Sequence, residues 1–286
     1  MRVKEPCEET KLDEFEHYLR KRNQSDHTIA AYLCGVRYFH SRYQDLTIEN
    51  LKSYRSFLIK NYRPATINQR VCGMNSYLRF LESAHDDEYP LAKGYRLNSI
   101  KVPHESFQDS IISNEDCRLL ETRLKEEGYE FWYFIVRFLV TTGARVSELT
   151  QIKVEHLACG YLDLYSKGGK MRRLYITDTL CNEAMDWCKR LHRTSGFLFI
   201  TANGNLISVR GIQSRLRFFA ERYGINPNTA YPHSFRHRFA INFLERCSDI
   251  ALLADLMGHE SIETTRIYLK KSKKEQQALL EEIVTW

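Results

Sequence analysis

The stretch HSFRHRFAINFLERC, residues 233–247, is followed at residues 258–269 by GHESIETTRIYL. Apolar residues recur in both stretches at the spacing of one helix face, so both are predicted to form helices. Each stretch also carries polar side chains that are able to act on a phosphate. These are an arginine, two histidines and a tyrosine: Arg236, His233, His259 and Tyr268.

Two upstream segments add to this set. Residues 141–149, TTGARVSEL, supply Arg145 just after a predicted buried helix that ends at Gly143. Residues 165–174, YSKGGKMRRL, supply Lys167 in a predicted tight hairpin between two strands. Six residues that are able to converge on one phosphate therefore lie in four segments.

Breaking a phosphodiester without a metal ion requires a nucleophile, positive donors for the non-bridging oxygens, and an acid for the departing oxygen. Arginine suits the second task because its planar fork matches phosphate oxygens. Donors that are in place before the reaction stabilise the developing charge. Tyrosine is a known covalent nucleophile, although a pKa of about 10 means that it needs a base or a cationic pocket. A hairpin lysine can protonate the leaving alkoxide.

Each of these residues also has an ordinary structural explanation when it is taken alone. Arg145 could pair with Glu148, Lys167 could be a solvated turn residue, and Tyr268 could be a packing aromatic. No single residue favours chemistry on a phosphate. The order of the residues and the sequence motifs around them do.

The chain of 286 residues predicts a mainly α fold with a small β-sheet, an α+β arrangement in two domains. Residues 1–92 hold four amphipathic helices and no strand pattern, which is typical of a small helical bundle. Residues 93–112 are predicted as a linker. Residues 113–286 are predicted as a second domain, which opens with a capping signature at Ser113 and Asp116.

Two further elements are predicted in the second domain. Residues 197–208, FLFITANGNLIS, have the pattern of a short strand pair that turns on Asn203 and Gly204. The tail, KKEQQALLEEIVTW at residues 273–286, is predicted as an acidic amphipathic helix.

Composition narrows the class of protein. The net charge of +6 and the pI near 8.8 are compatible with nucleic-acid binding. The eight cysteines form no C-x-x-C pair, so we expect reduced thiols and no metal site. The amino terminus is polar, unlike a signal peptide, and the run FWYFIVRFLV is too short to span a membrane. These features predict a cytoplasmic protein.

Four segments closely resemble the sequence motifs of tyrosine site-specific recombinases, the integrase and Xer group. They are TTGARVSEL, SKGGK, HSFRHRFA and LMGHESIETTRIYL. The resemblance covers nearly the whole chain. The helical first part resembles that family's core-binding domain, and the chain from residue 113 onward resembles its catalytic domain. The H-x-x-R box, together with a G-H box whose histidine precedes a tyrosine by nine residues, is specific.

The resemblance implies a role for each residue of the phosphate-binding set. Arg145 and Arg236 would be the two phosphate-clamping arginines, and His259 would hydrogen-bond the phosphate. His237 and Arg238 lie inside the H-x-x-R box but are not catalytic positions of the family. We expect these two residues on the surface or at the DNA backbone.

The resemblance also assigns the residues that move protons and attack. Tyr268 would attack phosphorus, with His233 as its acid/base partner. Lys167 would be the general acid on the hairpin. Lys170 is the rival for this role, but the word S-K-G-G-K aligns the first lysine with that of the family.

The implied reaction is a cycle of strand exchange. Tyr268 would displace a 5′-hydroxyl and form a 3′-phosphotyrosyl link, so that neither a metal nor ATP nor any other cofactor is needed. Two rounds would make and resolve a four-way junction, in a homotetramer bound to double-stranded DNA with inverted-repeat core sites. The tail from Lys273 to Trp286 resembles a helix that is donated to a neighbouring subunit. Docking of that helix on its own domain is the competing interpretation.

Basic residues in both domains are predicted to contact DNA, mostly through phosphates. Neutralised phosphates release counterions, so binding should weaken steeply as salt rises. The predicted DNA-contact residues are Arg63, Arg70, Arg79, Lys170, Arg172, Arg173, Arg210, Gln213 and Arg215.

Three alternatives stay open at this point. They are an architectural DNA-binding protein on the same scaffold, a type IB topoisomerase, and, less favoured, a metal-dependent nuclease. The first predicted helix begins by about residue 11. We take this start to favour a simple Xer-like or mobile-element recombinase over phage integrases that carry an extra amino-terminal domain. Integration, excision, inversion and dimer resolution are not distinguished.

Overall fold

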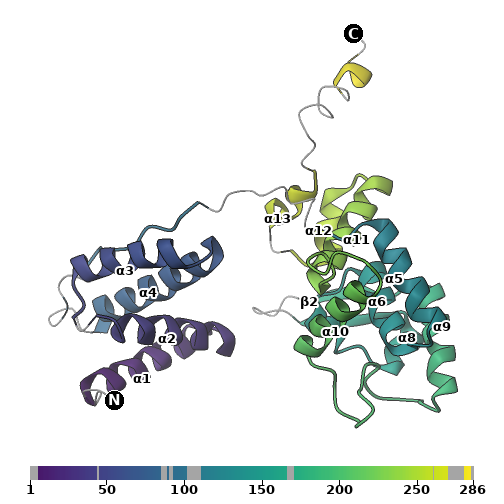
Figure 1. Cartoon of the computed structure of the whole chain (residues 1–286), viewed down its shortest axis with the longest axis horizontal. Helices are drawn as coiled ribbons and strands as arrows, with labels where there is room; N and C mark the ends of the chain where they lie inside the picture. Colours follow the sequence, from purple (N-terminus) through teal and green to yellow (C-terminus); the bar gives the residue numbers. More distant parts are fainter. Residues whose placement is uncertain are drawn as a thin grey trace. The chain divides into compact units, whose positions relative to one another are not determined.

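The computed structural model describes residues 6–43, 45–84, 89, 93–101, 111–165, 171–259, 261–269 and 280–284. In these ranges the chain is mainly helical with one two-stranded sheet, as predicted (Figure 1). It divides into two compact units, Met1–Glu105 and Ser106–Trp286. Among the described residues, no helix is both long and apolar enough to cross a membrane.

Four helices form the first unit, and the sequence signals that predicted them are in place. Ser25 accepts a hydrogen bond from the Thr28 amide at the start of the second helix, and Thr47 caps the third in the same way. Pro64 is the first residue of the fourth helix, where its missing N–H costs nothing. The helices are α1 Pro6–Lys21, α2 Asp26–His40, α3 Ile48–Asn61 and α4 Pro64–Ala84.

The core of the first unit is aromatic. Phe15, Phe39 and Tyr54 are fully buried there, and α2 and α4 make the most extensive contact between helices of this unit. Gly73 makes this approach possible, because a Cβ at that position would lie only 3.2 Å from the Tyr32 Cα. The bundle therefore derives its stability from a continuous apolar interior.

The segment 93–101, which falls in the predicted linker, lies along α4. The Asn75 amide donates to the Leu97 carbonyl at 2.9 Å and accepts from the Leu97 amide at 2.8 Å. Asn68 holds Ile100 with the same pair of bonds, at 3.0 and 2.9 Å. Side chains of two asparagines on α4 thus hold the backbone of the segment 93–101 against the bundle. Residues 102–110 lie outside the described residues, and the domain boundaries stay a prediction.

The second unit surrounds α6, a strongly apolar helix whose Phe138 and Leu139 are fully buried. Helices α5, α9 and α11 contact it. The elements of this unit are α5 Asn114–Glu126, α6 Glu130–Thr142, α7 Val146–Leu149, α8 Val154–Cys159, β1 Tyr161–Tyr165, β2 Met171–Tyr175, α9 Asp178–Arg190, α10 Val209–Arg222, α11 Pro232–Arg246, α12 Ile250–Met257, α13 Ile262–Arg266 and the 3₁₀ helix η3 Ile267–Leu269.

The predicted hairpin is confirmed at its strands: β1 and β2 are antiparallel, with Tyr161 opposite Tyr175. The second predicted strand pair, in residues 197–208, is wrong. Only a single bridge joins Ile200 to Leu206, around a turn in which the Gly204 amide donates to the Thr201 carbonyl. The chain cannot extend this ladder, because α10 begins directly after its cap at Ser208.

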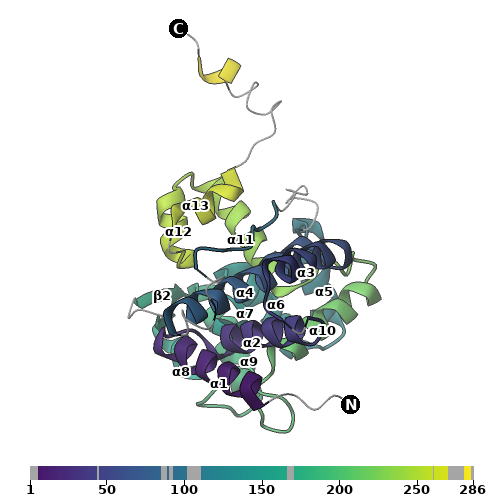
Figure 2. The ribbon, with the colours of Figure 1, turned by 90° about the vertical axis from the view of Figure 1, so that its left-hand side faces the viewer.

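Helices α11, α12 and α13 lie side by side at one end of the second unit, as Figures 1 and 2 both show. Ala240, Leu253 and Met257 form a small buried cluster between them. Tyr268, in η3, packs against this cluster. The end of α6 and the turn after α12 meet here, which brings five of the six predicted site residues together.

Candidate active site

Arg145 is positioned by the turn that ends α6. Gly143 adopts a left-handed conformation (φ +61), and a Cβ there would lie 2.4 Å from a ring carbon of Phe239 on α11. The chain therefore turns against α11, and Arg145 is the N-cap residue of α7. Its guanidinium donates to Glu148 Oε1 at 2.9 Å and to the Gly258 carbonyl at 3.0 Å. With 42% of its side chain exposed, Arg145 is oriented and still accessible to a ligand.

Glu148 is a buried carboxylate between two arginines. It accepts from the Arg145 backbone amide at 2.7 Å, and its other partner is Arg172 on β2. Burial acts to raise the pKa of Glu148, but hydrogen bonds from Arg172 and Arg145 lower it more, so that the net pKa is lowered. Glu148 therefore stays charged and fixes both guanidinium groups. Its pairing with Arg145, the ordinary structural alternative, coexists with the site.

Arg172, predicted to contact DNA, is engaged inside the protein. Its guanidinium pairs with Glu148 and donates to the Leu256 carbonyl at 2.7 Å, and only 13% of the side chain is exposed. It also packs on Gly258, where a Cβ would lie 2.0 Å from the Arg172 Cδ. This placement favours a supporting position, which ties the hairpin to the turn before His259, over direct contact with DNA.

Arg236 is the largest fully buried side chain of the described residues, with 1% exposed. It donates to the Gly143 carbonyl at 2.6 Å and to the Met257 carbonyl at 2.5 Å, and its second terminal nitrogen also lies 3.2 Å from His259 Nε2. Burial first, and then the charge of Arg145, lower its pKa to about 10, so it remains protonated at neutral pH. All of these partners are neutral, so the charge is left to act on an incoming anion.

The tautomer of His259 follows from its neighbours. Arg236 can only donate, so Nε2 of His259 is the acceptor and Nδ1 carries the proton. Nδ1 then donates to Thr265 Oγ1 at 2.7 Å, and Thr265 is fully buried. Burial and the charge of Arg236 lower the pKa of His259 to about 4, so its ring is neutral. The sequence analysis did not predict that Thr265 would orient His259. The only signal in the sequence was a hydroxyl side chain six residues after the histidine.

Tyr268 hydrogen-bonds to His237, which corrects one expectation. The Tyr268 hydroxyl lies 2.6 Å from His237 Nδ1, and His237 is only 7% exposed. The expectation of a surface histidine was wrong because residue 237 is on the inner side of α11. Burial raises the pKa of Tyr268 to about 12, although Arg236 lowers it in part. For His237, burial and then His233 lower the pKa to about 3.

Helix α11 carries two further residues of the H-x-x-R segment, His233 and Arg238. The exposed ring of His233 packs edge-on against that of His237, with 4.2 Å between centroids. Protein atoms on one side of this exposed residue desolvate its ring in part, and this desolvation, followed by the charge of Arg236, lowers the pKa of His233. Arg238 was also expected on the surface or at the DNA backbone. It is partly buried instead and donates to the Ile112 carbonyl at 2.7 Å, so it ties α11 to the chain before α5.

Five of the six predicted residues thus come together at one end of the second unit. The sixth, Lys167, lies outside the described residues, as does Lys170. The strands β1 and β2 flank this segment, and β2 contacts α12. The described residues contain no cluster of histidine, cysteine, aspartate and glutamate suited to a metal ion. The five residues that come together are Arg145, His233, Arg236, His259 and Tyr268.

The other predicted DNA contacts divide by environment. Arg173 pairs with Asp163 and lies over the Tyr161 ring, and Arg70 lies between the rings of Tyr38 and Tyr62. These two guanidinium groups already have partners within the protein. The exposed members of the set are Arg63, Arg79, Arg210, Gln213 and Arg215.

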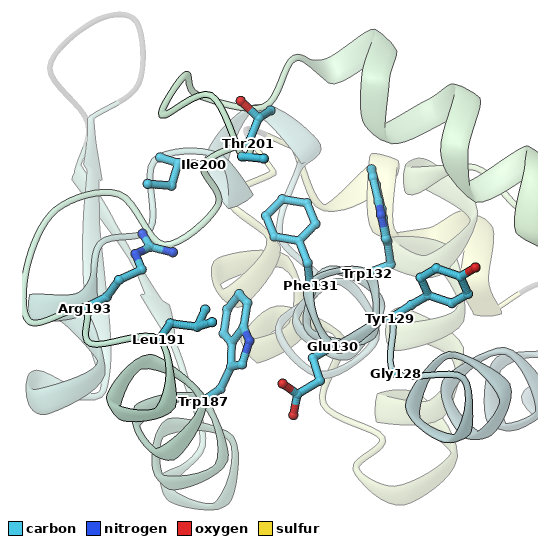
Figure 3. A pocket seen from close by; sticks show the side chains of 11 residues that line it. Gly128, Tyr129, Glu130, Phe131, Trp132, Trp187, Leu191, Arg193, Ile200 and Thr201 are labelled. Carbon is cyan, nitrogen blue, oxygen red and sulfur yellow. The ribbon is translucent and has the colours of Figure 1, made fainter.

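An aromatic pocket lies elsewhere in the second unit, at the N-terminal end of α6 (Figure 3). Phe131, Trp132 and Trp187 line it, together with Leu191 and Ile200. Helix α6 has 13 residues, so its two ends are about 18 Å apart at 1.5 Å per residue. Arg145 follows the opposite end. The pocket is therefore separate from the arginine and histidine cluster.

Comparison with known proteins identifies the family of the chain. The phage integrase family matches residues 113–275. Tyrosine recombinase XerA of Pyrococcus furiosus is 29% identical over 270 residues, covering 92% of this chain and 90% of that protein. XerA of Thermococcus kodakarensis is 30% identical over 270 residues, covering 91% and 90%. The chain belongs to the phage integrase family, and the predicted likeness to tyrosine recombinases is confirmed.

A solved structure shares the fold. It is the XerH site-specific recombinase bound to palindromic difH substrate, in a post-cleavage complex. The TM-score is 0.69 with 19% identity, covering 96% of this chain and 84% of XerH. At this identity the likeness concerns the fold alone, which is the mainly α class with a small sheet.

Proposed function

We propose that this chain is a site-specific DNA recombinase that cuts and rejoins DNA through a covalent link between Tyr268 and a 3′-phosphate. The observation that carries the proposal is the arrangement at one end of the second unit. There a partly buried phenol lies against an imidazole, and the charged forks of Arg145 and Arg236 reach the same turn at the end of α12. A nucleophile and preorganised cations in one place suit attack on a phosphodiester.

Arg145 and Arg236 hold the non-bridging oxygens of the scissile phosphate in this proposal. Arg236 remains a cation at neutral pH, and the carbonyl partners of both arginines fix the direction of each fork. His259 joins them as the third phosphate ligand. Its Nε2 accepts from Arg236 without DNA, so donation to a phosphate requires a proton on that nitrogen. The negative charge of the phosphate favours that protonated form.

The chemical step exchanges one phosphoester for another. Tyr268 Oη bonds to phosphorus while the bond from phosphorus to O5′ breaks. The phenolic proton leaves to an imidazole on α11, with His233 as the proposed acid/base partner. Lys167 supplies a proton to O5′, a role that rests on the family resemblance. The link keeps the energy of the ester, so a 5′-hydroxyl of a partner strand can reverse the step without ATP or a metal.

We propose a separate role for each part of the chain and a tetrameric assembly on DNA. Residues 1–92 bind the core site, residues 93–112 link the domains, and residues 113–286 carry out catalysis. The enzyme acts in the cytoplasm as a homotetramer on inverted-repeat sites, for which the palindromic substrate of XerH offers support. The tail from Lys273 to Trp286 docks on a neighbouring subunit, with docking on its own domain as the alternative. The same reaction can act on the DNA of a mobile element or on a chromosome.

Salt dependence tests the binding mode. The exposed basic residues of the two units act mainly on phosphates, so affinity should fall steeply between low and moderate salt. Titration of a labelled core-site duplex at several salt concentrations measures this slope. An affinity that is flat over this range contradicts a backbone-dominated contact.

A nicked suicide substrate tests the reaction itself. Cleavage near the nick releases a short strand, so the covalent intermediate accumulates. The wild-type chain should form the adduct in the presence of a chelator, whereas Y268F should bind the DNA and form none. A binder without chemistry yields no adduct with either protein, and a metal-dependent nuclease loses cleavage in the chelator. A topoisomerase would relax supercoils without preference for a site.

A further inference from the structure

The hydroxyl of the proposed nucleophile is hydrogen-bonded to a histidine that the family resemblance does not assign to catalysis. His237 Nδ1 lies 2.6 Å from Tyr268 Oη, across 31 positions of sequence. His233, the expected acid/base partner, instead packs edge-on against the His237 ring. Of these two imidazoles, His237 is the one bonded to the atom that would attack phosphorus.

We propose that His237 is a catalytic residue, which accepts the phenolic proton of Tyr268 at Nδ1 as Oη attacks phosphorus. The inference rests on the proposed function and names His237, in place of His233, as the residue that accepts the phenolic proton. One bond forms between Oη and phosphorus, and the bond from phosphorus to O5′ breaks. The phenolic proton moves to His237 Nδ1, while the leaving O5′ takes its proton from a separate acid. No oxidant, reductant or further reactant is required.

The tautomer of His237 suits this role. A neutral imidazole has one acceptor nitrogen, and a phenol that donates to Nδ1 leaves the proton of the ring on Nε2. The ring is 7% exposed and is surrounded by positive or polar groups: His233 and Arg236 on α11, His259 after α12, and Tyr268 itself. Burial, and then these neighbours, keep His237 uncharged in the free protein, so that its Nδ1 can accept the hydrogen bond of Tyr268.

The same surroundings explain why the reaction waits for DNA. With a pKa of about 12 for Tyr268 and about 3 for His237, the proton stays on the phenol in the free protein. A phosphate on Arg145 and Arg236 brings negative charge, which favours a protonated imidazole. Formation of the bond to phosphorus withdraws electrons from Oη and makes its proton far more acidic. Transfer to His237 is therefore coupled to attack.

Two substitutions separate proton transfer from positioning. H237A removes the ring, whereas H237N keeps a side-chain oxygen that accepts a hydrogen bond but cannot take up a proton. The assay is the rate of adduct formation on the nicked suicide substrate at saturating protein. We expect both variants to lose roughly 100-fold or more of the cleavage rate, the usual contribution of general acid–base catalysis. DNA affinity and thermal unfolding should show that the variants are folded.

Chemical rescue gives the readout that a structural role would not produce. Free imidazole should restore part of the H237A rate, with a restoration that grows as pH rises through the pKa of imidazole. A 5′-bridging sulfur in the substrate makes a leaving group that needs no acid. It should restore cleavage by a Lys167 variant but not by H237A. The matched control is H156A, which removes a histidine of α8 and should cleave like the wild type.

The outcomes distinguish the inference from the function on which it rests. Normal cleavage by H237A, or by H237N at close to the wild-type rate, overturns the proton-acceptor role while wild-type adduct at Tyr268 leaves the recombinase proposal standing. The same holds if the sulfur substrate rescues H237A, because the lost proton then belongs to the leaving group. Failure of the wild-type chain to form an adduct would instead refute the function itself.

Discussion

Each unit of this protein takes an arginine out of solvent, and the two environments are opposite in kind. In the first unit Arg70 lies 4.3 Å from the Tyr38 ring centre and 4.2 Å from that of Tyr62. Burial lowers its pKa, but the oxygens of Tyr62 and Tyr54 raise it more, so the net pKa is raised. Arg236 in the second unit has carbonyl and imidazole partners and a second arginine close by, and its pKa is lowered.

This difference shows how to separate a structural buried cation from a functional one. Aromatic faces and phenol oxygens stabilise the charge of Arg70 within the fold, although its Nη1 atom is buried without a hydrogen-bond partner among the described residues. The surroundings of Arg236 satisfy its N–H groups but leave its charge uncompensated at close range. Such a site stays unfavourable until an anion arrives, which is what a preorganised phosphate clamp requires.

The largest effect should come from Arg236. Replacing it with alanine removes one clamp of the phosphate, and we expect strand cleavage to fall by roughly 10² to 10³-fold, as for the loss of one oxyanion donor. Adduct formation on the suicide substrate measures this loss, with binding followed separately. R70M is the matched control and should cleave at nearly the wild-type rate. If R70M loses as much cleavage as R236A, the contrast between the two arginines fails.

Glu148 supports the clamp, so its removal should act on stability and on activity together. E148Q leaves Arg172 and Arg145 without a carboxylate in a buried site, which costs roughly 3 kcal/mol of unfolding free energy. The folded pKa of Glu148 lies below its usual 4.5. Its stabilisation is therefore present above pH ~4.5 and is lost as pH falls through the lower folded pKa. Denaturant melts of both proteins between pH 3 and pH 7 should converge at the acid end. A gap that stays constant with pH excludes this linkage.

Arg70 should matter to the first unit alone. We expect R70M to lower the unfolding free energy by about 1 to 2 kcal/mol, through the loss of its contacts with Tyr38 and Tyr62. Urea melts monitored by tyrosine fluorescence report this change. R63M, at an exposed position of the same unit, is the comparison and should unfold like the wild type. Equal stability of R70M and the wild type would show that the aromatic contacts add nothing.

The smallest effect concerns the orientation of His259. Thr265 fixes its tautomer by accepting from Nδ1, and T265V removes that acceptor at nearly constant volume. We expect a loss of cleavage of about five- to tenfold, equivalent to one neutral hydrogen bond of about 1 kcal/mol. T265S keeps the hydroxyl and should retain most of the rate. A serine variant as impaired as the valine variant would point to packing rather than to the hydrogen bond.

Local signals in the sequence were sufficient for the regular elements. Ser25, Thr47 and Ser113 cap the helices that they predicted, and Gly143 ends α6 in the left-handed conformation. These are short-range rules, in which side chains act on the backbone within a few residues. Helix α9 was missed although its signal is of the same kind, with Thr177 as its cap and Leu180 at the start of an apolar face.

The remaining features depend on contacts that are remote in sequence. Nothing local to Asn75 indicates that it binds Leu97, and His237 looks like any basic residue until η3 brings Tyr268 to it. Arg172 likewise reads as an exposed cation of a hairpin, and its partner Glu148 lies 24 residues away. The family resemblance supplied the positions of the predicted site residues, whereas the hydrogen bonds among them required three dimensions.

The most direct test of the central claim is to locate the covalent bond to DNA. The adduct trapped on a nicked core-site substrate is digested with nuclease and trypsin, and the modified peptide is sequenced by mass spectrometry. The account predicts a phosphonucleotide on Tyr268, in the peptide that follows Arg266, linked through the 3′-phosphate. A modification on any other side chain, or a stable link to a 5′-phosphate, would contradict it.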